Sequence, residues 1–343
     1  MPGGGILRVS FFLNRLCRYN WCGMVDALLL YNPAAGRFSV RPFLSNVICP
    51  LREHGWRLEV AETVNGRHAT QLARLAASEN LRAVFAIGGD GTIGQVAAGL
   101  VGSQTALGVL PAGTSNVWAR ELGLPAFTWL NLRALEANAR RLAQASVYAI
   151  DVGLCNDQPF LMWAGVGLDA LTVHKLEPRK RFAKYLAVPH YAATTIWSAS
   201  LWHGLNLRVW ANDRCIEGHF LLAVASNIRH YLGGLTQLSP RAYVDDGQMD
   251  LWLFSGDDLA DAFRHFFALR AGRHLNSEQA RCVPFHTVRI ESDTAFSIQL
   301  DGEPMLGAST ADLRVIPKGL RVLLPDEAKY LLCPSQEEGS AKP

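Results

Sequence analysis

Glycines surround a single aspartate in the stretch Gly88-Gly89-Asp90-Gly91-Thr92, and these residues are the most typical of a chemical site. The apolar run before them predicts a buried strand, and Thr92 to Leu100 has the spacing of a helix packed on that strand. Because glycine has no Cβ atom, a phosphate can approach the amide groups at the start of the helix. A carboxylate repels phosphate, so Asp90 is useful there only if it binds Mg²⁺ or orders a neighbouring donor. We interpret the stretch as a nucleotide–metal site; the alternative is a sharp turn in which Asp90 caps the helix.

Two other turns follow predicted strands in the first half of the chain. One is Asn32-Pro33-Ala34-Ala35-Gly36, and the other is Pro111-Ala112-Gly113-Thr114-Ser115-Asn116. Strands are expected at Val25 to Tyr31, Trp56 to Ala61 and Ala106 to Leu110, and helices at Pro42 to His54 and Arg67 to Glu79. This alternation predicts an open parallel sheet covered by helices on both faces. Ligands bind outside the carboxyl ends of such strands, so we expect the three turns to converge on one crevice.

The pattern changes near Ser146, where strands begin to dominate. We expect strands at Ser146 to Val152, Pro159 to Ala164, Leu205 to Ala211, His219 to Ser226, Met249 to Phe254, Thr287 to Ser292, Phe296 to Leu300 and Leu320 to Leu324. Helical interruptions are expected at about 180–202 and 257–271. The fold class is therefore α/β plus β: an α/β nucleotide-binding domain over residues 24–145, then an antiparallel β-sandwich over residues 146–309 that binds the substrate. The polar tail, residues 334–343, is expected to be disordered.

Composition and charge argue against several classes of protein. The 343 residues are 49% hydrophobic, enough for about two domains with sizeable cores. A net charge of +3, without a basic stripe interleaved with aromatic residues, argues against nucleic acid as a partner. The seven cysteines show no C-x-x-C pair or zinc spacing, so we interpret them as reduced thiols of a cytoplasmic protein. There is no run of about 18 uninterrupted apolar residues, so a transmembrane helix is not expected.

Residues 1–23 allow two interpretations. The stretch from Ile6 to Trp21 is apolar but carries three arginines, which fits neither a signal peptide nor a membrane span. It is either a short interfacial helix or an extension upstream of the true start at Met24. We favour the second interpretation, because a predicted strand begins directly after Met24.

A series of short motifs carries a resemblance to a known family. They are Asn32-Pro33 with Gly36, Gly88-Gly89-Asp90-Gly91-Thr92, Pro111 with Gly113-Thr114-Ser115-Asn116, Asp151-Val152-Gly153, residues 164–170, Gly233-Gly234 with Pro240 and Ala242, Asp245-Asp246-Gly247 and Asp301-Gly302-Glu303. In this order they resemble the diacylglycerol kinase catalytic-domain family, which includes bacterial lipid kinases and, more distantly, sphingosine kinases. The resemblance covers about residues 24–325 and implies a nucleotide domain, a β-sandwich and a last segment, about residues 310–330, that returns to the first domain.

The resemblance also implies roles for individual residues. ATP would be bound by Asn32, Pro33, Gly36, Thr63, Gly88, Gly89, Asp90, Gly91, Thr92, Thr114 and Asn116. Mg²⁺ would be held by Asp246 with the backbone carbonyls of Tyr243 and Gln248, and Glu303 falls where the family places its proton acceptor. Asp301 and Asp90 are grouped with Glu303 as catalytic residues. Phosphoryl transfer to an alcohol requires bound phosphates, offset charge and a hydroxyl relieved of its proton. A carboxylate can do the last, a contribution of about 10²- to 10⁴-fold.

Alternatives stay open for several of these residues. Asp-Gly pairs are common in hairpin turns, so Asp245-Asp246-Gly247 and Asp301-Gly302-Glu303 would in isolation be mere turns. A metal near Asp246 would serve either catalysis or the order of the fold. Val117 stands where many bacterial members carry Asp, and this leaves the acceptor open between a diacylglycerol, which we expect, and a sphingoid base.

Rival functions make different demands on the sequence. An NAD kinase shares the glycine loop and the two-domain plan, but it would carry an Asn-Glu pair where this chain has Asn116 and then Val117. A silent lipid- or nucleotide-binding regulator would have lost Glu303 or Asp90, and both are present. We therefore expect an ATP- and Mg²⁺-dependent lipid kinase that makes phosphatidate.

A basic cluster is the candidate for membrane contact. Lys175, Arg179, Lys180, Arg181 and Lys184 precede an aromatic-rich stretch that ends at Trp202. Cations beside aromatic residues suit an anionic membrane surface. The alternative is a solvated loop followed by a helix packed on the sandwich. We expect a cytoplasmic protein, peripheral to the inner face of the membrane, and leave open whether it forms a homodimer.

Overall fold

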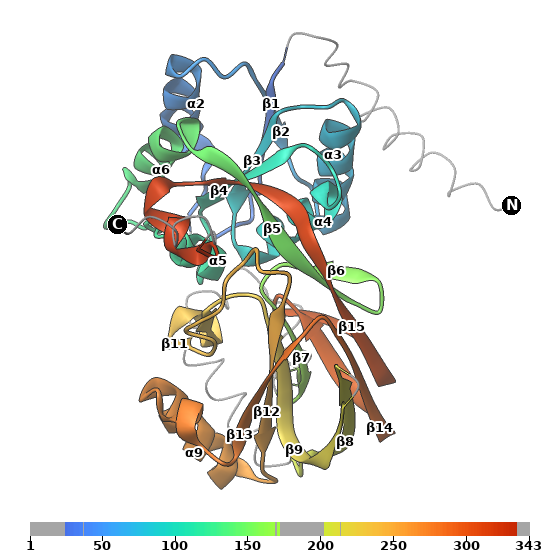
Figure 1. Ribbon diagram of the computed structural model, residues 1–343. Helices are drawn as coiled ribbons and strands as arrows, with labels where there is room; N and C mark the ends of the chain where they lie inside the picture. The colour runs from blue at the N-terminus through green and yellow to red at the C-terminus, as the bar shows by residue number, and fades with distance from the viewer. Residues whose placement is uncertain (1–24, 37, 169, 172–201, 213, 335–343) are drawn as a thin grey trace, which may run out of the picture.

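The computed structural model describes residues 25–36, 38–168, 170–171, 202–212 and 214–334. The chain forms two parts, an α/β part that lies above and a mainly β part that lies below in Figure 1. The basic cluster at 175–184, the aromatic-rich stretch up to residue 201, and residues 1–23 and 335–343 lie outside the described residues. Within the described ranges, no helix is long and apolar enough to cross a membrane.

Strands and helices alternate in the α/β part, because each short apolar run is closed by turn residues. The elements are β1 (Ala27–Tyr31), η1 (Arg41–Phe43), α2 (Leu44–Glu53), β2 (Leu58–Glu62), α3 (Gly66–Ser78), β3 (Ala83–Gly88), α4 (Asp90–Leu100), β4 (Ala106–Pro111), α5 (Val117–Glu121) and α6 (Ala134–Ala143). α3 begins after Asn65, whose side chain caps the helix by accepting a hydrogen bond from the His68 amide. The strands and helices predicted here are confirmed, with ends that differ by a few residues.

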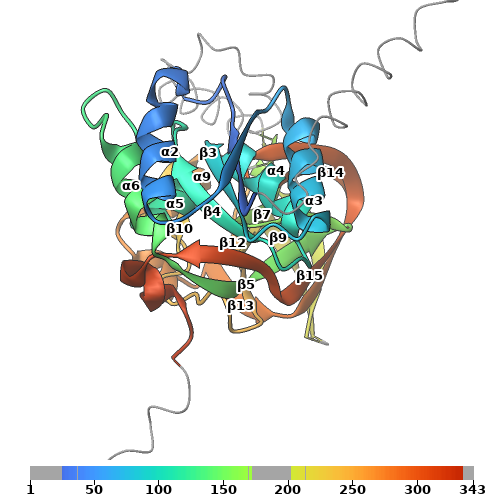
Figure 2. The ribbon, with the colours of Figure 1, turned by 90° about the horizontal axis from the view of Figure 1, so that it is seen from above.

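The sheet of the α/β part is parallel. β1 lies between β2 and β3, and β3 pairs with β4. Figure 2 shows α2 and α6 on one face of this sheet and α3 and α4 on the other. The buried side chains of β1 alternate between the faces: Leu28 and Leu30 pack in the core that includes α3 and α4, and Leu29 packs in the core that includes α2 and α6. The predicted open parallel sheet with two covered faces is confirmed.

Antiparallel strands build the β part. Its elements are β5 (Ser146–Cys155), β6 (Gln158–Phe160), β7 (Trp163–Gly167), β8 (Leu205–Ala211), β9 (Arg214–Ser226), β10 (His230–Tyr231), η3 (Leu232–Gly234), β11 (Thr236–Gln237), β12 (Met249–Ser255), α9 (Leu259–Arg270), η4 (Arg273–Asn276), β13 (Ala280–Phe285), β14 (Thr287–Leu300), β15 (Glu303–Leu324) and η5 (Asp326–Leu331). Buried and exposed residues alternate strictly along β8. Its inward side chains, such as Val209, share a core with Leu251 and Ile290, as the β-sandwich prediction requires.

Two long strands join the parts. β15 spans 22 residues and pairs first with β14 and then with β5, both antiparallel. Near its end, Val322 pairs in parallel with Leu107 of β4. Hydrogen bonds therefore run without interruption from one part to the other, and Figure 1 shows β5 and β15 crossing between them. This continuity fixes the β14–β15 turn relative to the α/β part.

Two strand predictions were wrong in detail. The single strand expected over Pro159 to Ala164 is two strands, β6 and β7, because the chain turns at Leu161 and Met162 to present amides to a carboxylate. The two strands expected over 287–292 and 296–300 are one strand, β14, in which a register shift between Glu291 and Phe296 absorbs the polar interruption.

Candidate active site

The three glycine-bearing turns meet at the carboxyl ends of β1, β3 and β4. A Cβ atom on Gly36 would overlap the carbonyl oxygen of Ala112, and a Cβ on Gly113 would overlap Cα of Gly89. Gly36 also has φ of 62°, a left-handed conformation that favours glycine. Backbone is thus packed directly against backbone, and the expected convergence of the three turns is confirmed.

Side chains from two of these turns are joined to each other. Asn32 Nδ2 donates to Oγ1 of Thr92 at 2.9 Å, and Asn32 Oδ1 accepts from the Ala34 amide at 2.9 Å. Thr63 is buried and its hydroxyl donates to the Tyr31 carbonyl, so it braces the end of β1. Thr114 is exposed. Of the residues predicted to bind ATP, Asn32 and Thr63 are therefore bonded to neighbouring groups of the protein, whereas Thr114 is open to solvent.

Asn116 shapes its turn from within. It is buried, adopts a left-handed conformation with φ of 50°, accepts from the Gly113 amide through Oδ1 at 2.8 Å and donates to the Gly113 carbonyl through Nδ2 at 2.9 Å. Its side-chain amide is thus used inside the loop. These two bonds set the shape of the Gly113 turn.

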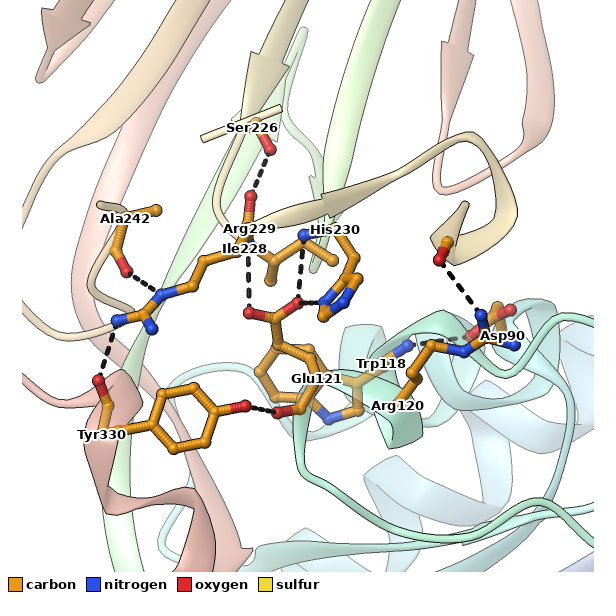
Figure 3. Close-up of polar contacts among 11 residues, drawn as sticks. Asp90, Trp118, Arg120, Glu121, Ser226, Ile228, Arg229, His230, Ala242 and Tyr330 are labelled. Carbon is orange, nitrogen blue, oxygen red and sulfur yellow. Dashed lines mark hydrogen bonds and ion pairs between the residues drawn. The ribbon is translucent and has the colours of Figure 1, made fainter. Parts of the chain in front are cut away.

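Asp90 orders a neighbouring segment. Its Oδ1 atom accepts a hydrogen bond from the Trp118 amide at 3.2 Å, at the start of α5, as Figure 3 shows. Burial raises the pKa of the Asp90 carboxyl, while hydrogen bonds from the amides of Val117, Trp118 and Asn116 act in the opposite direction. The residue at the cap of α4 is Gly89, so the idea that Asp90 caps its own helix is wrong. Its carboxylate instead accepts a hydrogen bond from the first turn of the next helix, α5.

Asp301 lies in the tight turn between β14 and β15. Asp301 and Gly302 both have positive φ, as a two-residue hairpin turn requires. The carboxylate accepts hydrogen bonds from the amides of Leu161 at 2.7 Å, Met162 at 2.7 Å and Trp163 at 3.0 Å. Burial nevertheless raises the pKa of Asp301 to about 6, and the charge of Asp90 adds to the increase. The turn is therefore anchored to the loop between β6 and β7.

Glu303 lies against the glycine loop. A Cβ atom on Gly91 would come within 2.8 Å of Oε1 of Glu303, and a Cβ on Gly94 would come within 3.3 Å of Oδ2 of Asp301. The first turns of α4 carry glycine where the two carboxylates approach. The structure thus gathers Asp90, Asp301 and Glu303 around the start of α4. Gly94 was missed by the sequence analysis, although its spacing from Gly91 places it on the same face of the helix.

The predicted metal residues form a second acidic turn. Asp246 Oδ1 accepts from the Gln248 amide at 3.0 Å, and Asp245 Oδ1 accepts from the Cys333 amide at 2.6 Å. Asp246 is exposed as a residue, but partial burial of its carboxyl raises the pKa, and the charges of Asp245 and Asp250 raise it further. Carboxylate and carbonyl oxygens suit a hard cation, and a cation would relieve this repulsion. In the part of the chain that the structure describes, no three His, Cys, Asp or Glu side chains are grouped to hold a metal.

Asp151 positions this acidic turn. Its two oxygens accept hydrogen bonds from the Gly247 amide at 2.6 Å and the Lys318 amide at 2.7 Å. Asp151 lies in β5 and Lys318 in β15, so the turn is tied to the two strands that cross between the parts. The Asp151-Val152-Gly153 motif therefore has a structural reason.

Sequence analysis missed a buried acid at the junction of the two parts. Glu121 ends α5, is fully buried, and accepts from the amides of Arg229 at 3.2 Å and His230 at 3.1 Å and from Nδ1 of His230 at 2.6 Å. Figure 3 shows these contacts beside the Tyr330 hydroxyl, which donates to the Glu121 carbonyl. The sequence signal for this acid was its place, next to Arg120, at the end of the short apolar segment after Asn116.

Comparison with known proteins identifies the family. The family model "Diacylglycerol kinase catalytic domain" matches residues 26–155, and the model "YegS C-terminal NAD kinase beta sandwich-like domain" matches residues 163–324. A diacylglycerol kinase of Bacillus subtilis (strain 168) is 28% identical over 283 residues, which cover 82% of this chain and 90% of that protein. A protein of Chromohalobacter salexigens named "Probable lipid kinase YegS-like" is 32% identical over 296 residues, which cover 81% of this chain and 87% of that protein.

A solved structure shares the fold. The crystal structure of a diacylglycerol kinase from Bacillus anthracis strain Sterne aligns with a TM-score of 0.66 at 19% sequence identity, over 89% of this chain and 99% of that one. The resemblance deduced from the motifs is thus confirmed by independent matches to both parts of the molecule. This chain belongs to the diacylglycerol kinase catalytic-domain family, and it is an ATP-dependent lipid kinase.

Proposed function

We propose that the protein transfers the γ-phosphate of ATP to the free hydroxyl of a diacylglycerol and so makes phosphatidate. The observation that carries this proposal is the position of Glu303, whose carboxylate lies against Gly91 in the glycine loop. A proton acceptor held at the phosphate-binding loop is what transfer to an alcohol requires. The names of relatives, among them the Bacillus subtilis diacylglycerol kinase, support this acceptor.

The residues divide the reaction between them. The backbone amides of Gly89 to Thr92 and the dipole of α4 hold the phosphates. The lipid oxygen attacks the γ-phosphorus, the bond to the β-phosphate oxygen breaks with ADP as leaving group, and the hydroxyl proton passes to Glu303. Asp301 does not take part in bond formation; it keeps the turn that carries Glu303 attached to the amides of Leu161 to Trp163.

We further propose a role for Mg²⁺. Asp246 would bind it with carbonyl oxygens of Tyr243 and Gln248, in surroundings made acidic by Asp245 and Asp250. The cation would offset the negative charge of the acidic turn and so order it. Within the protein, Asp151 supports this turn by accepting the Gly247 amide.

The acceptor's place in a bilayer suggests where the protein acts. We propose that it works as a peripheral protein on the inner face of the cytoplasmic membrane. A sphingoid base is the alternative acceptor, motivated by Val117. That residue is buried, and its amide contributes to the hydrogen bonds at Asp90. The departure from the family pattern at this position therefore leaves the surroundings of Asp90 intact.

The test is phosphate transfer with separated acceptors. Purified protein receives Mg·ATP labelled in the γ-phosphate, with mixed micelles that carry either diacylglycerol or sphingosine, and with NAD as a soluble acceptor in a parallel reaction. Label in diacylglycerol is the expected result. Label in sphingosine alone would replace the acceptor but keep the reaction class, whereas label in NAD alone would overturn the proposal.

A further inference from the structure

α9 turns an aromatic face to solvent. Phe263, Phe266 and Phe267 are exposed by 42%, 38% and 64%, while His265 and Leu269 are buried on the opposite side. Leu235 and Leu275, exposed by 55% and 49%, belong to the adjoining segments η3 and η4 or their flanks. Figure 1 shows α9 on the outside of the β part, away from the α/β part. Large apolar side chains gathered on one helix face mark an interaction surface.

The acidic residues of α9 lie at its start, at Asp258 and Asp261, and the charged residues that follow are basic. From Phe263 to Leu275 the chain carries Arg264, Arg270 and Arg273 and no acidic residue. Arg264 is paired with Asp261 at 2.6 Å, so its charge is offset. Arg270 donates to the carbonyl of Leu235 at 2.6 Å, a neutral partner that leaves its positive charge in place and attaches the η3 segment to α9. A helix with phenylalanines and arginines on its outer face has the chemistry of an interfacial helix.

We propose that the α9 face, made of Phe263, Phe266, Phe267, Arg270, Leu235 and Leu275, binds the surface of an anionic phospholipid bilayer. The phenylalanine rings enter the boundary between headgroups and acyl chains, and the arginines pair with lipid phosphates. The residues of this face do not include those of the basic cluster at 175–184. The proposal rests on the proposed function, because an enzyme with a membrane-embedded acceptor needs a surface that binds the membrane.

The experiment separates membrane binding from chemistry. The double variant Phe263→Ser/Phe267→Ser is compared with the wild type in sedimentation with vesicles of phosphatidylcholine containing phosphatidylglycerol. Both proteins are also assayed with long-chain diacylglycerol in those vesicles and with short-chain diacylglycerol in solution. Trp210→Ser is the matched control, because Trp210 is another exposed aromatic residue, on β8.

The expected result is a loss in one assay only. The double variant binds vesicles about tenfold more weakly or worse, because it lacks two rings that insert into the bilayer. Its activity on diacylglycerol in vesicles falls in proportion. Activity on the soluble acceptor and the behaviour of Trp210→Ser stay at the wild-type level. Unchanged sedimentation of the double variant with the vesicles would overturn the proposal. Absence of activity on every lipid in the wild type would count against the proposed function instead.

A separate set of contacts identifies a positioning residue. α5 has five residues and touches a different part of the site at each end: Asp90 accepts the Trp118 amide at its start, and Glu121 accepts amides of the β part at its end. Beside Glu121, Arg120 donates to the Gly234 carbonyl at 3.1 Å. Figure 3 shows both ends of the helix in one view. α5 therefore connects the glycine loop to the β part by direct contacts.

The β-part end of this connection is held from two sides. The Arg229 guanidinium donates to the carbonyls of Ala242 at 3.0 Å and Tyr330 at 2.8 Å. The Arg229–His230 segment, whose amides bind Glu121, is therefore also hydrogen-bonded to η5 through Tyr330. The buried Glu121 carboxylate has two amides and a histidine ring as partners. A buried carboxylate whose hydrogen-bond partners lie on the other part of the molecule holds the two parts in one arrangement.

We infer that Glu121 is a positioning residue that sets the β part, and with it the acceptor lipid, at the correct distance from the phosphates bound near Asp90. Glu121→Gln keeps the size of the side chain but turns an NH₂ group toward donors, so the junction loosens. A misplacement of about 1 Å can lower turnover by about 10²-fold. ATP binding does not depend on this contact.

The test compares transfer with binding. Glu121→Gln and the milder His230→Asn are measured for the Kd of ATP, for kcat on soluble short-chain diacylglycerol and for the midpoint of thermal unfolding. Asn138→Ala is the stability control, since Asn138 is buried in α6 and bonds the Pro125 carbonyl away from the junction. We expect kcat to fall about tenfold to a hundredfold in Glu121→Gln, with Kd for ATP within about twofold of wild type. The inference would be overturned if Glu121→Gln lost ATP affinity as much as kcat. It would also be overturned if Asn138→Ala, at the same change in unfolding midpoint, lost as much kcat as Glu121→Gln. If Glu121→Gln does not fold, His230→Asn carries the same comparison.

Discussion

The two Asp-Gly turns of this chain look alike in sequence and differ in structure. In Asp301-Gly302-Glu303, the aspartate is surrounded by three amides and the glutamate is pressed against Gly91. In Asp245-Asp246-Gly247, Asp246 is exposed and lies among other acids. The first turn joins two long strands of the sheet, whereas the second is held by side-chain contacts from Asp151.

This difference separates two uses of a carboxylate. Rigid placement against the glycine loop suits the proposed proton acceptor, which must lie at a fixed distance from the attacking hydroxyl. Uncompensated negative charge at the surface suits a cation, which needs oxygen ligands and little else. Substitutions in the two turns should therefore fail in different ways.

The largest effect is expected for Glu303→Gln. Glutamine keeps the size of the side chain but cannot accept the proton, so turnover should fall by about 10²- to 10⁴-fold. The Kd for ATP and the unfolding midpoint should stay near wild type in equilibrium binding and thermal melts. Glu291→Gln, on the neighbouring strand β14, is the control. Wild-type turnover in Glu303→Gln would remove Glu303 from the role of base.

A smaller loss of turnover is expected when a substitution at Gly91 displaces the Glu303 carboxylate but leaves the residue in place. The Cβ of Gly91→Ala would meet Oε1 of Glu303 at 2.8 Å, so the carboxylate must shift by a few tenths of an ångström or more. We expect turnover to fall by about tenfold to a hundredfold. Gly94→Ala, whose Cβ would meet Asp301 at 3.3 Å, should lose less. Steady-state kinetics that rank the two variants in the opposite order would contradict this account of the first turn.

Sequence patterns predicted the parallel sheet and its glycine turns because these features are local. Apolar runs closed by glycine specify strands, and the carboxyl ends of parallel strands lie at one edge without further information. The site residues Asp90, Asp301 and Glu303 were named in advance, but their gathering depends on β15. Its 22 residues pair with β14, β5 and β4 in turn, and no local pattern shows such a path.

Hydrogen bonds between a carboxylate and distant backbone amides could not be predicted from the sequence, as two examples show. Glu121 is matched to backbone amides of Arg229 and His230, and amides carry no sequence signature. The split of residues 159–164 into β6 and β7 depends on Asp301, which lies far along the chain. Long-range hydrogen bonds to backbone groups are thus the part of this structure that sequence reading missed.

The pH dependence of stability tests the enclosure of Asp301. Its pKa is raised from 3.8 to about 6, so between about pH 4 and pH 6 the folded protein binds more protons than the unfolded chain. Stability should therefore fall as pH rises through this window, by up to about 3 kcal/mol from this residue. Asp301→Asn should lose this component. Denaturant unfolding at pH 4 and pH 7 measures this component as the fall in the free energy of unfolding, which should be larger in the wild type than in Asp301→Asn. Asp312→Asn should keep the wild-type fall. If the fall is reduced as much in Asp312→Asn as in Asp301→Asn, the effect is not specific to the enclosed carboxyl.

The smallest effect is expected at the second turn. Asp246→Ala removes one exposed carboxylate, so the fold should persist and turnover should fall only a few-fold at saturating Mg²⁺. The informative measurement is the unfolding midpoint with Mg²⁺ and with chelator, because a cation that binds only the folded state stabilises it. In the wild type Mg²⁺ should raise the midpoint, and in Asp246→Ala this rise should be lost. Asp293→Ala, which removes an exposed carboxylate paired with Arg208, should keep it. A rise of equal size in all three proteins would mean that the acidic turn at 245–247 does not hold the cation, and the contrast between the two turns would then concern packing alone.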